Sequence, residues 1–518
     1  MSPRLLRSTY VVGGMTLISR ITGFLRDIVF ARAFGAGMGM DAFVVAFQIP
    51  NFLRRLFGEG AFSQAFVPVF SEYHSRRTRA DVRDLAASVT GTLGVILFVV
   101  TIIGVIASPL LILLFSAGFA DNAEQYGLAV AMLRLTFPYL FFISLTALAA
   151  GVLNTLGRFA VPAFTPVLLN LCLIGGAVIL APQMERPVYG LAIAVFVAGV
   201  VQLGFQIPFM ARAGVLSWPK WGRHHEGVQR IFVLMLPAIF GSSVAQVNLL
   251  IDRHIASWLQ TGSISWLYYS DRLMEFPLGV FGIALATVIL PGLSERYAKQ
   301  EMAVFSATLD WALRVMVLIM LPAAIALFML AGPIISTLFQ YGDFAARDTR
   351  MASFSVMAYA IGLLGFALVK VLAPGYFSRQ DTRTPVRIGV IAMIVNVVLN
   401  FAFVLPMVRF GFAAPHTGLA LATGLAALLN AGLLYRGLRR RQVYTPERGW
   451  GVLLLRYTLA NVAMAFALYY IVGATEWWLD ADGLARTLRL AQCIVVGAAV
   501  YGVVLLMTGF RPAHLRTH

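Results

Sequence analysis

Basic side chains occur inside long apolar stretches of this chain, where an ionisable group is costly unless it faces protein or water. Arg20, Arg26 and Arg55 stand in two of these stretches, and nearby acids are too few to neutralise them all. A buried cation in that position is best neutralised by an anionic ligand. Because the planar guanidinium suits phosphate oxygens, and several arginines can share two charges, we predict a diphosphate-binding site.

Helical spacing groups further polar side chains with these arginines. Four of them fall at three- and four-residue steps and share one helix face: Gln48, Asn51, Arg55 and Glu59. Arg272 and Glu275 lie three residues apart and can pair, so an intrahelical ion pair explains them as well as a ligand contact does. Pro50 and Pro277 stand in these same two stretches and should bend or open the helices.

Three more ionisable side chains have two interpretations each. Arg54 and Asp41 either belong to the predicted binding site or lie near the water interface. Lys370 either adds a positive charge to the site or extends its amine to the interface along its apolar stem. All three are candidate binding residues.

The composition is that of an integral membrane protein. Apolar residues make up 59% of the 518 residues and charged residues only 12%, with a mean hydropathy of +0.82, whereas soluble domains are about 25% charged. The apolar runs suit helices that cross a core of about 30 Å, and they lack the alternation of barrel strands. We predict an all-α polytopic protein with fourteen spans, at residues 8–34, 41–70, 84–116, 126–153, 161–182, 188–211, 228–257, 265–294, 304–331, 351–377, 385–406, 416–436, 450–473 and 486–508.

Basic residues between the spans predict the orientation. Lys and Arg concentrate in segments on the side of the N-terminus, so both termini are expected in the cytoplasm. The outside loops hold only Arg186, Arg347, Arg350, Arg409 and Arg486. A net charge of +17 could suggest nucleic acid, but the basic residues form short clusters between apolar runs, which excludes that class.

The sequence also repeats itself. Pro68-x-x-Ser71-Glu72 recurs as Pro291-x-x-Ser294-Glu295, and Gly190-Leu-Ala-Ile-Ala recurs as Gly418-Leu-Ala-Leu-Ala. The repeat unit holds six spans, and an even number gives both halves the same orientation, with a pseudo-twofold axis along the membrane normal. We predict lobes at 1–223 and 224–446, followed by two extra helices at 447–518.

Three motifs resemble those of the MurJ (MviN) family. The first reads Ser19-Arg20-x-x-Gly23-Phe24-x-Arg26-Asp27 and continues through Asp41-Ala42-Phe43 to Pro50-Asn51-x-x-Arg54-Arg55-x-Phe57-x-Glu59-Gly60-Ala61-Phe62. The others read Tyr268-x-x-Asp271-Arg272-x-x-Glu275-Phe276-Pro277 and Ala373-Pro374-Gly375-x-x-Ser378-Arg379-Gln380-Asp381. The resemblance covers essentially the whole chain.

This resemblance implies a fold and an activity. The family consists of lipid II flippases of the multidrug/oligosaccharidyl-lipid/polysaccharide exporter superfamily, which are transporters and not enzymes. It implies two six-helix lobes, a central cationic cavity, and a hydrophobic groove for the lipid tail formed with the last two helices. The family's important cavity residues correspond to Arg20, Arg26, Arg54, Arg272, Lys370, Asp41 and Glu275. Gln48 departs from the pattern, because many members carry a basic residue there.

Some members of the family have a sodium site between the seventh, eleventh and twelfth spans. Its ligands correspond to Asp252, Asn396, Asn400 and Thr423. The family pattern has a second acid at the position of Asn400, which weakens the case for sodium here. No cofactor is expected; sodium, protons or the membrane potential could drive transport, since one charge moved across 100 mV is worth about 2.3 kcal/mol.

The function predicted in this way is translocation of lipid II, an undecaprenyl-diphosphate-linked peptidoglycan precursor, across the bacterial cytoplasmic membrane by alternating access. Expected partners are lipid II and membrane lipids, with other cell-wall synthesis proteins as further candidates. A polysaccharide-lipid or drug/cation exporter is the alternative, although a cation exporter should present acids and aromatics to its substrate. A glycan polymerase should carry catalytic carboxylates on a large outer loop, and the longest outer loop, near Gly332–Arg350, has only Asp343 and Asp348.

Overall fold

A computed structural model describes residues 3–55 and 62–511 of the chain. The regular secondary structure of these residues is entirely helical, with no strand, which confirms the all-α prediction. The chain forms two compact units, Met1–Ser265 and Trp266–His518. The predicted division into lobes at 223 and a helix pair at 447 stays a prediction. Glu59, one of the predicted site residues, lies outside the described residues.

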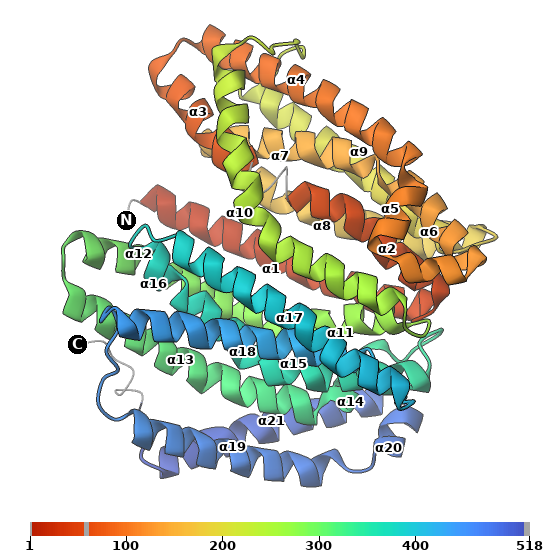
Figure 1. Cartoon of the computed structure of the whole chain (residues 1–518), viewed down its shortest axis with the longest axis vertical. Coiled ribbons are helices and arrows are strands. Elements are labelled where there is room, and N and C mark those ends of the chain that lie inside the picture. Colours follow the sequence, from red (N-terminus) through yellow and green to blue (C-terminus); the bar gives the residue numbers. More distant parts are fainter. Residues whose placement is uncertain (1–2, 56–61, 512–518) are drawn as a thin grey trace. The chain divides into compact units, whose positions relative to one another are not determined.

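The helices of the first unit can be followed in Figure 1 from red to green. They are α1 (Pro3–Phe34), α2 (Met38–Leu53), α3 (Ser63–Arg76), α4 (Arg79–Ile106), α5 (Ser108–Phe115), α6 (Ala123–Thr136), α7 (Tyr139–Thr155), α8 (Ala160–Gly175), α9 (Tyr189–Arg212) and α10 (Glu226–Ser257). Among them α1 packs on α8, α2 on α6, and α7 on α9.

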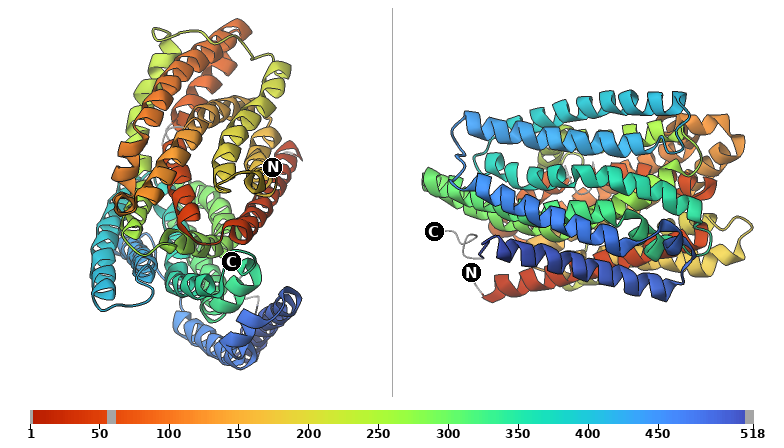
Figure 2. Two further views of the ribbon diagram at one scale, coloured as in Figure 1. Left: turned by 90° about the vertical axis from the view of Figure 1, so that its right-hand side faces the viewer. Right: turned by 90° about the horizontal axis from the view of Figure 1, so that it is seen from below.

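The second unit contains most of α11 and all that follows it. Its helices are α11 (Ser263–Pro277), α12 (Ile283–Ala298), α13 (Met302–Met329), α14 (Ala331–Phe339), α15 (Ala346–Leu372), α16 (Pro374–Phe377), α17 (Arg383–Arg409), α18 (Thr417–Arg440), α19 (Trp450–Val472), α20 (Thr475–Asp480) and α21 (Gly483–Met507). Helices α19 and α21 lie side by side, in blue in Figure 2.

Eleven helical stretches in the described part of the chain are long and apolar enough to cross a membrane. Each coincides with one of the fourteen predicted spans, so the chain is a multi-pass membrane protein. The other three predicted spans, 8–34, 41–70 and 228–257, correspond to α1, to α2 with α3, and to α10. The sequence carries intramembrane charges in all three stretches, and α2, although apolar, has only 16 residues. The total of fourteen stays a prediction.

Proline interrupts one of the charged helices as the sequence predicts. Helix α11 ends at Pro277, and one π-helical turn, Leu278–Gly282, separates it from α12. Proline lacks the amide hydrogen and clashes with the preceding turn, so regular α-helical bonding cannot continue through it. Freed backbone groups at membrane depth are tolerated where they are buried in protein or line a cavity.

Small residues bring two helices of the second unit into backbone contact. A Cβ atom added to Gly362 of α15 would lie 2.2 Å from Cα of Gly424 on α18, and one added to Gly365 would lie 2.6 Å from the amide nitrogen of Leu428. Any side chain at Gly362 or Gly365 would push the helices apart. Close approach through small residues is the usual packing device of membrane helices.

A buried carboxylate fastens the start of α19 to α13. Asp310 is fully buried, and its Oδ1 accepts hydrogen bonds from the Tyr444 hydroxyl at 2.6 Å and the Trp450 indole at 2.7 Å. Its Oδ2 accepts from Nε of Arg314, one turn further along α13, at 2.5 Å. Because Tyr444 and Trp450 flank the loop into α19, Asp310 fixes one end of the α19–α21 pair.

The other end of the helix pair is held by an arginine. Arg486 of α21 is 5% exposed, and its guanidinium donates to the carbonyl oxygens of Ser336, Gln340 and Leu479 at 2.7–3.2 Å. Two of these carbonyls belong to the C-terminal end of α14 and its cap, where the helix dipole favours a cation. The pair α19–α21 is therefore fastened to the rest of the second unit at both ends.

Candidate functional site

Arg26 stands at the centre of a buried polar cluster in the first unit. Its Nε and Nη2 donate to Oδ1 of Asp27 at 3.0 and 2.7 Å, and its Nη1 donates to Oδ1 of Asn170 at 2.9 Å. Arg26 is 8% exposed and Asp27 1%. The ring of Phe30, one turn along α1, lies 5.6 Å from the guanidinium carbon. Arg26 therefore has its own neutralising acid, although acids are scarce around the predicted arginines as a group.

Asn170 joins α8 to this cluster and is a residue that the sequence did not single out. Its amide nitrogen donates to the carbonyl oxygen of Ser19 at 3.1 Å and to Oγ1 of Thr22 at 3.2 Å, while its oxygen accepts from Arg26. A Cβ on Gly23 would lie 3.4 Å from this amide, so glycine leaves room for it. One asparagine thus ties two turns of α1 to α8 and orients the Arg26 guanidinium.

The other predicted arginines of the first unit are more accessible. Arg20 lies two turns before Arg26 on α1 and is partly exposed. Arg54 follows the end of α2, and its Nε donates to Oδ1 of Asn51 at 3.1 Å. Arg55 is exposed. Unlike Arg26, none of these guanidinium groups is enclosed by protein, so each can approach a bound anion.

Asp41 accepts hydrogen bonds at the start of α11. It is 2% exposed; its Oδ2 accepts from the amide of Gly262 at 2.7 Å, and its Oδ1 accepts from the amide and the hydroxyl of Ser265 at 2.8 and 2.5 Å. Free amides at a helix start favour a carboxylate. These three donors are two backbone amides and a serine hydroxyl, so Asp41 fastens α2 to the beginning of α11.

The second unit holds the predicted pair on α11 and the lysine. Nη1 of Arg272 lies 2.9 Å from Oε2 of Glu275, and its guanidinium carbon lies 5.0 Å from the ring of Tyr268. The predicted intrahelical pair is confirmed, and it remains one-third to one-half exposed. Lys370 is exposed, and its Cγ would touch a Cβ on Gly282 at 3.9 Å, so its stem passes the π-helical turn after Pro277.

The residues of the predicted sodium site fall in both units. Asp252 belongs to the first unit, whereas Asn396, Asn400 and Thr423 belong to the second. Within the second unit Asn396 and Asn400 are buried on α17, and Oγ1 of Thr423 on α18 lies 3.5 Å from Oδ1 of Asn396. Amide and hydroxyl oxygens are hard donors that suit an alkali cation. In the described residues no three His, Cys, Asp or Glu side chains gather as a metal site.

Comparison with protein families and curated relatives identifies the chain. The family model described as "Lipid II flippase MurJ" matches residues 30–484. A probable lipid II flippase MurJ of Vibrio cholerae is 49% identical, covering 99% of this chain and 98% of its own length. The lipid II flippase MurJ of Burkholderia cenocepacia is 41% identical, covering 99% of both chains.

Solved structures agree with this assignment. A lipid II flippase MurJ in an inward closed conformation superposes with a TM-score of 0.79 at 26% identity, covering 96% of this chain and all of the other. A multidrug resistance MATE family transporter of the MOP superfamily in an inward-facing conformation has a TM-score of 0.65 at 16% identity, covering 84% and 98%, and this likeness concerns the fold alone. The chain belongs to the lipid II flippase MurJ family.

Proposed function

We propose that this protein is a transporter that flips lipid II from the inner to the outer leaflet of the bacterial cytoplasmic membrane. The observation that carries the proposal is a set of arginines on membrane helices, Arg20, Arg26, Arg54 and Arg55, in a chain of the lipid II flippase MurJ family. A diphosphate is the group that such arginines bind best, because each guanidinium can offer two parallel donors to phosphate oxygens.

The residues of the site have different parts in this proposal. Arg20, Arg54 and Arg55, which are partly or fully exposed, would contact the diphosphate directly. Arg26 would present the remaining edge of a guanidinium that Asp27 and Asn170 already hold in place. Arg272, Lys370 and Glu275 are the candidate contacts of the second unit, where the side chains of the Arg272–Glu275 pair are one-third to one-half exposed.

The transport cycle that we propose is alternating access. The diphosphate-sugar headgroup enters from the cytoplasmic side while the polyprenyl tail stays in lipid, and the lobes then rock to release the headgroup outside. The α19–α21 pair, fastened to the second unit by Asp310 and Arg486, would guide the tail. Sodium at Asp252, Asn396, Asn400 and Thr423, protons, or the membrane potential would drive the cycle. Other cell-wall synthesis proteins are candidate partners.

A drug/cation exporter is the second candidate, because the fold is shared with MATE transporters. A cation would need unpaired acids, whereas Asp27 is paired with Arg26 and Asp41 accepts hydrogen bonds from Gly262 and Ser265. The deciding experiment is flipping of fluorescent lipid II in proteoliposomes, with sodium gradient, proton gradient and potential varied one at a time. Flipping of lipid II that requires the sodium gradient, the proton gradient or the membrane potential supports the proposal and identifies the driving force. Ethidium transport without lipid II flipping would overturn it.

A further inference from the structure

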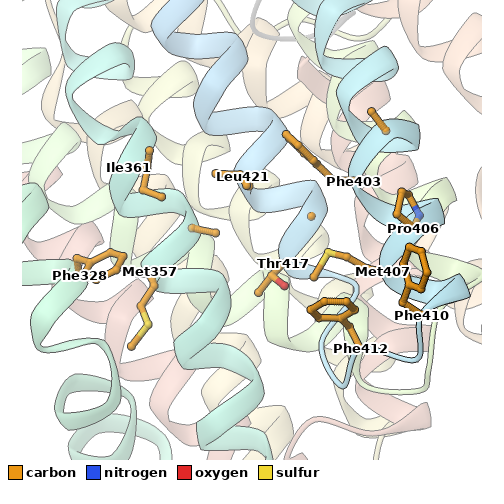
Figure 3. Close-up of a pocket in the computed structure, with 13 residues that line it drawn as sticks. Phe328, Met357, Ile361, Phe403, Pro406, Met407, Phe410, Phe412, Thr417 and Leu421 are labelled. Atoms are coloured by element: carbon orange, nitrogen blue, oxygen red, sulfur yellow. The ribbon is translucent and has the colours of Figure 1, made fainter.

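An apolar cavity of about 460 Å³ lies within the second unit, and none of the residues that line it is charged. Figure 3 shows Phe328 of α13 with Met357 and Ile361 of α15 on one side, and Phe403 and Met407 of α17 on the other, with Leu421 of α18 between them. Its volume is within the range of about 300–1,000 Å³ typical of ligand pockets. Among the lining residues only Thr417 has a polar side-chain group, and its hydroxyl donates to the carbonyl of Ala414. The cavity therefore suits a hydrocarbon chain.

The helix faces that line this cavity each continue to an arginine. On α17, Ala402 and Pro406 line the cavity, and Arg409 follows at the next three-residue step on the same face. On α15, Met357 and Ile361 line it, and Arg350 stands seven residues before Met357, again on the same face. Arg350 is near the start of α15 and Arg409 ends α17, so both mark the end of the cavity where the Phe410 and Phe412 loop lies.

These two arginines also differ from the other basic residues of the predicted outside loops. Arg186 pairs with Glu124, Arg347 stacks on Trp266, and Arg486 donates to three carbonyls. Arg350 and Arg409 are exposed, and neither guanidinium has an ion pair or hydrogen bond with any residue that the structure describes. Basic residues are disfavoured in outside loops, so two unpaired ones beside an apolar cavity call for a physical reason.

We propose that this cavity and its two arginines form a binding site for an anionic phospholipid of the surrounding bilayer. One acyl chain occupies the cavity, and the phosphate lies at the rim between Arg350 and Arg409. Charge complementarity selects the ligand: the walls carry no polar side chain except Thr417, and the two residues that we place at the rim, Arg350 and Arg409, are both cations. The neighbouring side chains Phe401 and Leu405 are 49% and 60% exposed, as expected for a surface in contact with lipid. A lipid held there would fill the space between α15, α17 and α18 and stabilise their packing. This inference does not depend on the proposed transport.

The test uses the full-length protein in phosphatidylcholine vesicles that contain spin-labelled lipid, with labelled phosphatidylglycerol compared with labelled phosphatidylcholine. The wild-type protein should retain phosphatidylglycerol preferentially in the motionally restricted fraction. Arg350→Gln and Arg409→Gln should each lower the preference about fivefold, the effect of one basic residue near a charged lipid surface. An unchanged preference in the double variant would overturn the proposal.

A second pair of variants tests the cavity itself. Ala402→Trp places an indole in the cavity and should reduce the restricted phosphatidylglycerol fraction, whereas Val398→Trp, at a 61% exposed position one turn earlier on α17, should leave it unchanged. Equal effects of the two variants would contradict the assignment. So would displacement of the labelled phosphatidylglycerol by one equivalent of undecaprenyl phosphate, because the site would then belong to polyprenyl lipids.

Discussion

All three guanidinium nitrogens of Arg26 donate to protein acceptors. A buried arginine can hold the fold together or contact a ligand, and these bonds bear on both roles. The bonds to Asp27 and Asn170 fix the position of the guanidinium, and a ligand can use only the donors that remain. The sequence could not show this arrangement, because side chains at adjacent helix positions do not normally face each other. The guanidinium lies beside Asp27 and the ring of Phe30, both of which follow Arg26 on α1, and Asn170 comes from a helix 144 residues later.

The role of Arg26 can be tested by removing the pair in two steps. Arg26→Ala leaves Asp27 buried and unpaired, and should lower stability by about 3–5 kcal/mol. Arg26→Ala combined with Asp27→Ala should recover most of that stability, because replacing a whole buried ion pair by apolar residues often leaves the free energy of unfolding unchanged. The double variant should still fail to flip lipid II. Thermal unfolding in detergent and lipid II flipping are measured together. A double variant that flips lipid II normally would show that Arg26 is a structural residue and not part of the diphosphate site.

Asp41 should contribute to stability, and through it to flipping, by its contacts with the start of α11. Asp41→Asn replaces one acceptor oxygen by an amide donor facing the amides of Gly262 and Ser265, and should cost about 1–3 kcal/mol. Ser265→Ala removes only the hydroxyl donor and should cost about 1 kcal/mol. If both variants lose flipping in proportion to their melting temperature, Asp41 positions α11. Full stability with no flipping in Asp41→Asn would instead place Asp41 against the substrate.

At the scale of the helices, the ends of the elements are fixed by individual polar side chains. Asp381 precedes α17: its Oδ1 accepts from the amide of Thr384 at 3.0 Å, and its Oδ2 accepts from Nη1 of Arg441 at 2.6 Å. Burial raises the pKa of Asp381, but the hydrogen bonds from Thr384 and Arg441 outweigh it, and the pKa lies below its usual value. The carboxylate therefore stabilises the fold in its charged form.

The pH dependence follows from the sign of that shift. A carboxyl group whose pKa is lower in the folded state stabilises the protein at neutral pH and ceases to do so as the pH falls through that lowered value. Asp381→Asn should therefore lower the melting temperature at pH 7, by the equivalent of about 0.2–1 kcal/mol for a partly exposed ion pair with Arg441, and the deficit should shrink below about pH 4. Asp343→Asn, at an exposed loop position, is the control. A deficit that stays constant down to pH 3 would contradict this account.

Asp310 offers the corresponding test for the α19–α21 pair. Asp310→Leu removes the buried carboxylate partner of Arg314, which is 13% exposed and keeps only Glu447 at 3.6 Å, and it removes the acceptor for Tyr444 and Trp450. The expected loss is about 3–5 kcal/mol, as for any broken buried pair, against about 1 kcal/mol for Tyr444→Phe. Limited proteolysis in the 441–449 loop should increase in the first variant and little in the second. Equal cleavage in both would show that Asp310 does not hold α19.

At the scale of the whole molecule, the sequence predicted the helical spans well because apolar run length is a local property. It did not predict the short helices α14 and α20, because nine and six residues are too few to be recognised by the length of an apolar run. Nor could spacing predict that Asp41 meets Ser265, or that Tyr444 and Trp450 meet Asp310, because those contacts join distant segments. Charge could single out candidate binding residues in the sequence, and their role stays a prediction, whereas a residue such as Asn170, which matters through its contacts with a distant helix, could not be singled out.

The orientation of the whole chain is the remaining large-scale prediction. If both termini are cytoplasmic, a reporter fused after Arg441, between α18 and α19, should read cytoplasmic, because the chain there carries consecutive arginines on the same side as the N-terminus. A reporter inserted within Asp343–Arg350, between α14 and α15, should read outside. The two readings must differ if α15, α17 and α18 cross the membrane in succession, since three crossings separate the sites. Paired alkaline phosphatase and green fluorescent protein fusions at both points measure this. An outside reading after Arg441 would change the number of spans. It would also change the predicted side of the membrane at which Arg350, Arg409 and the apolar cavity lie.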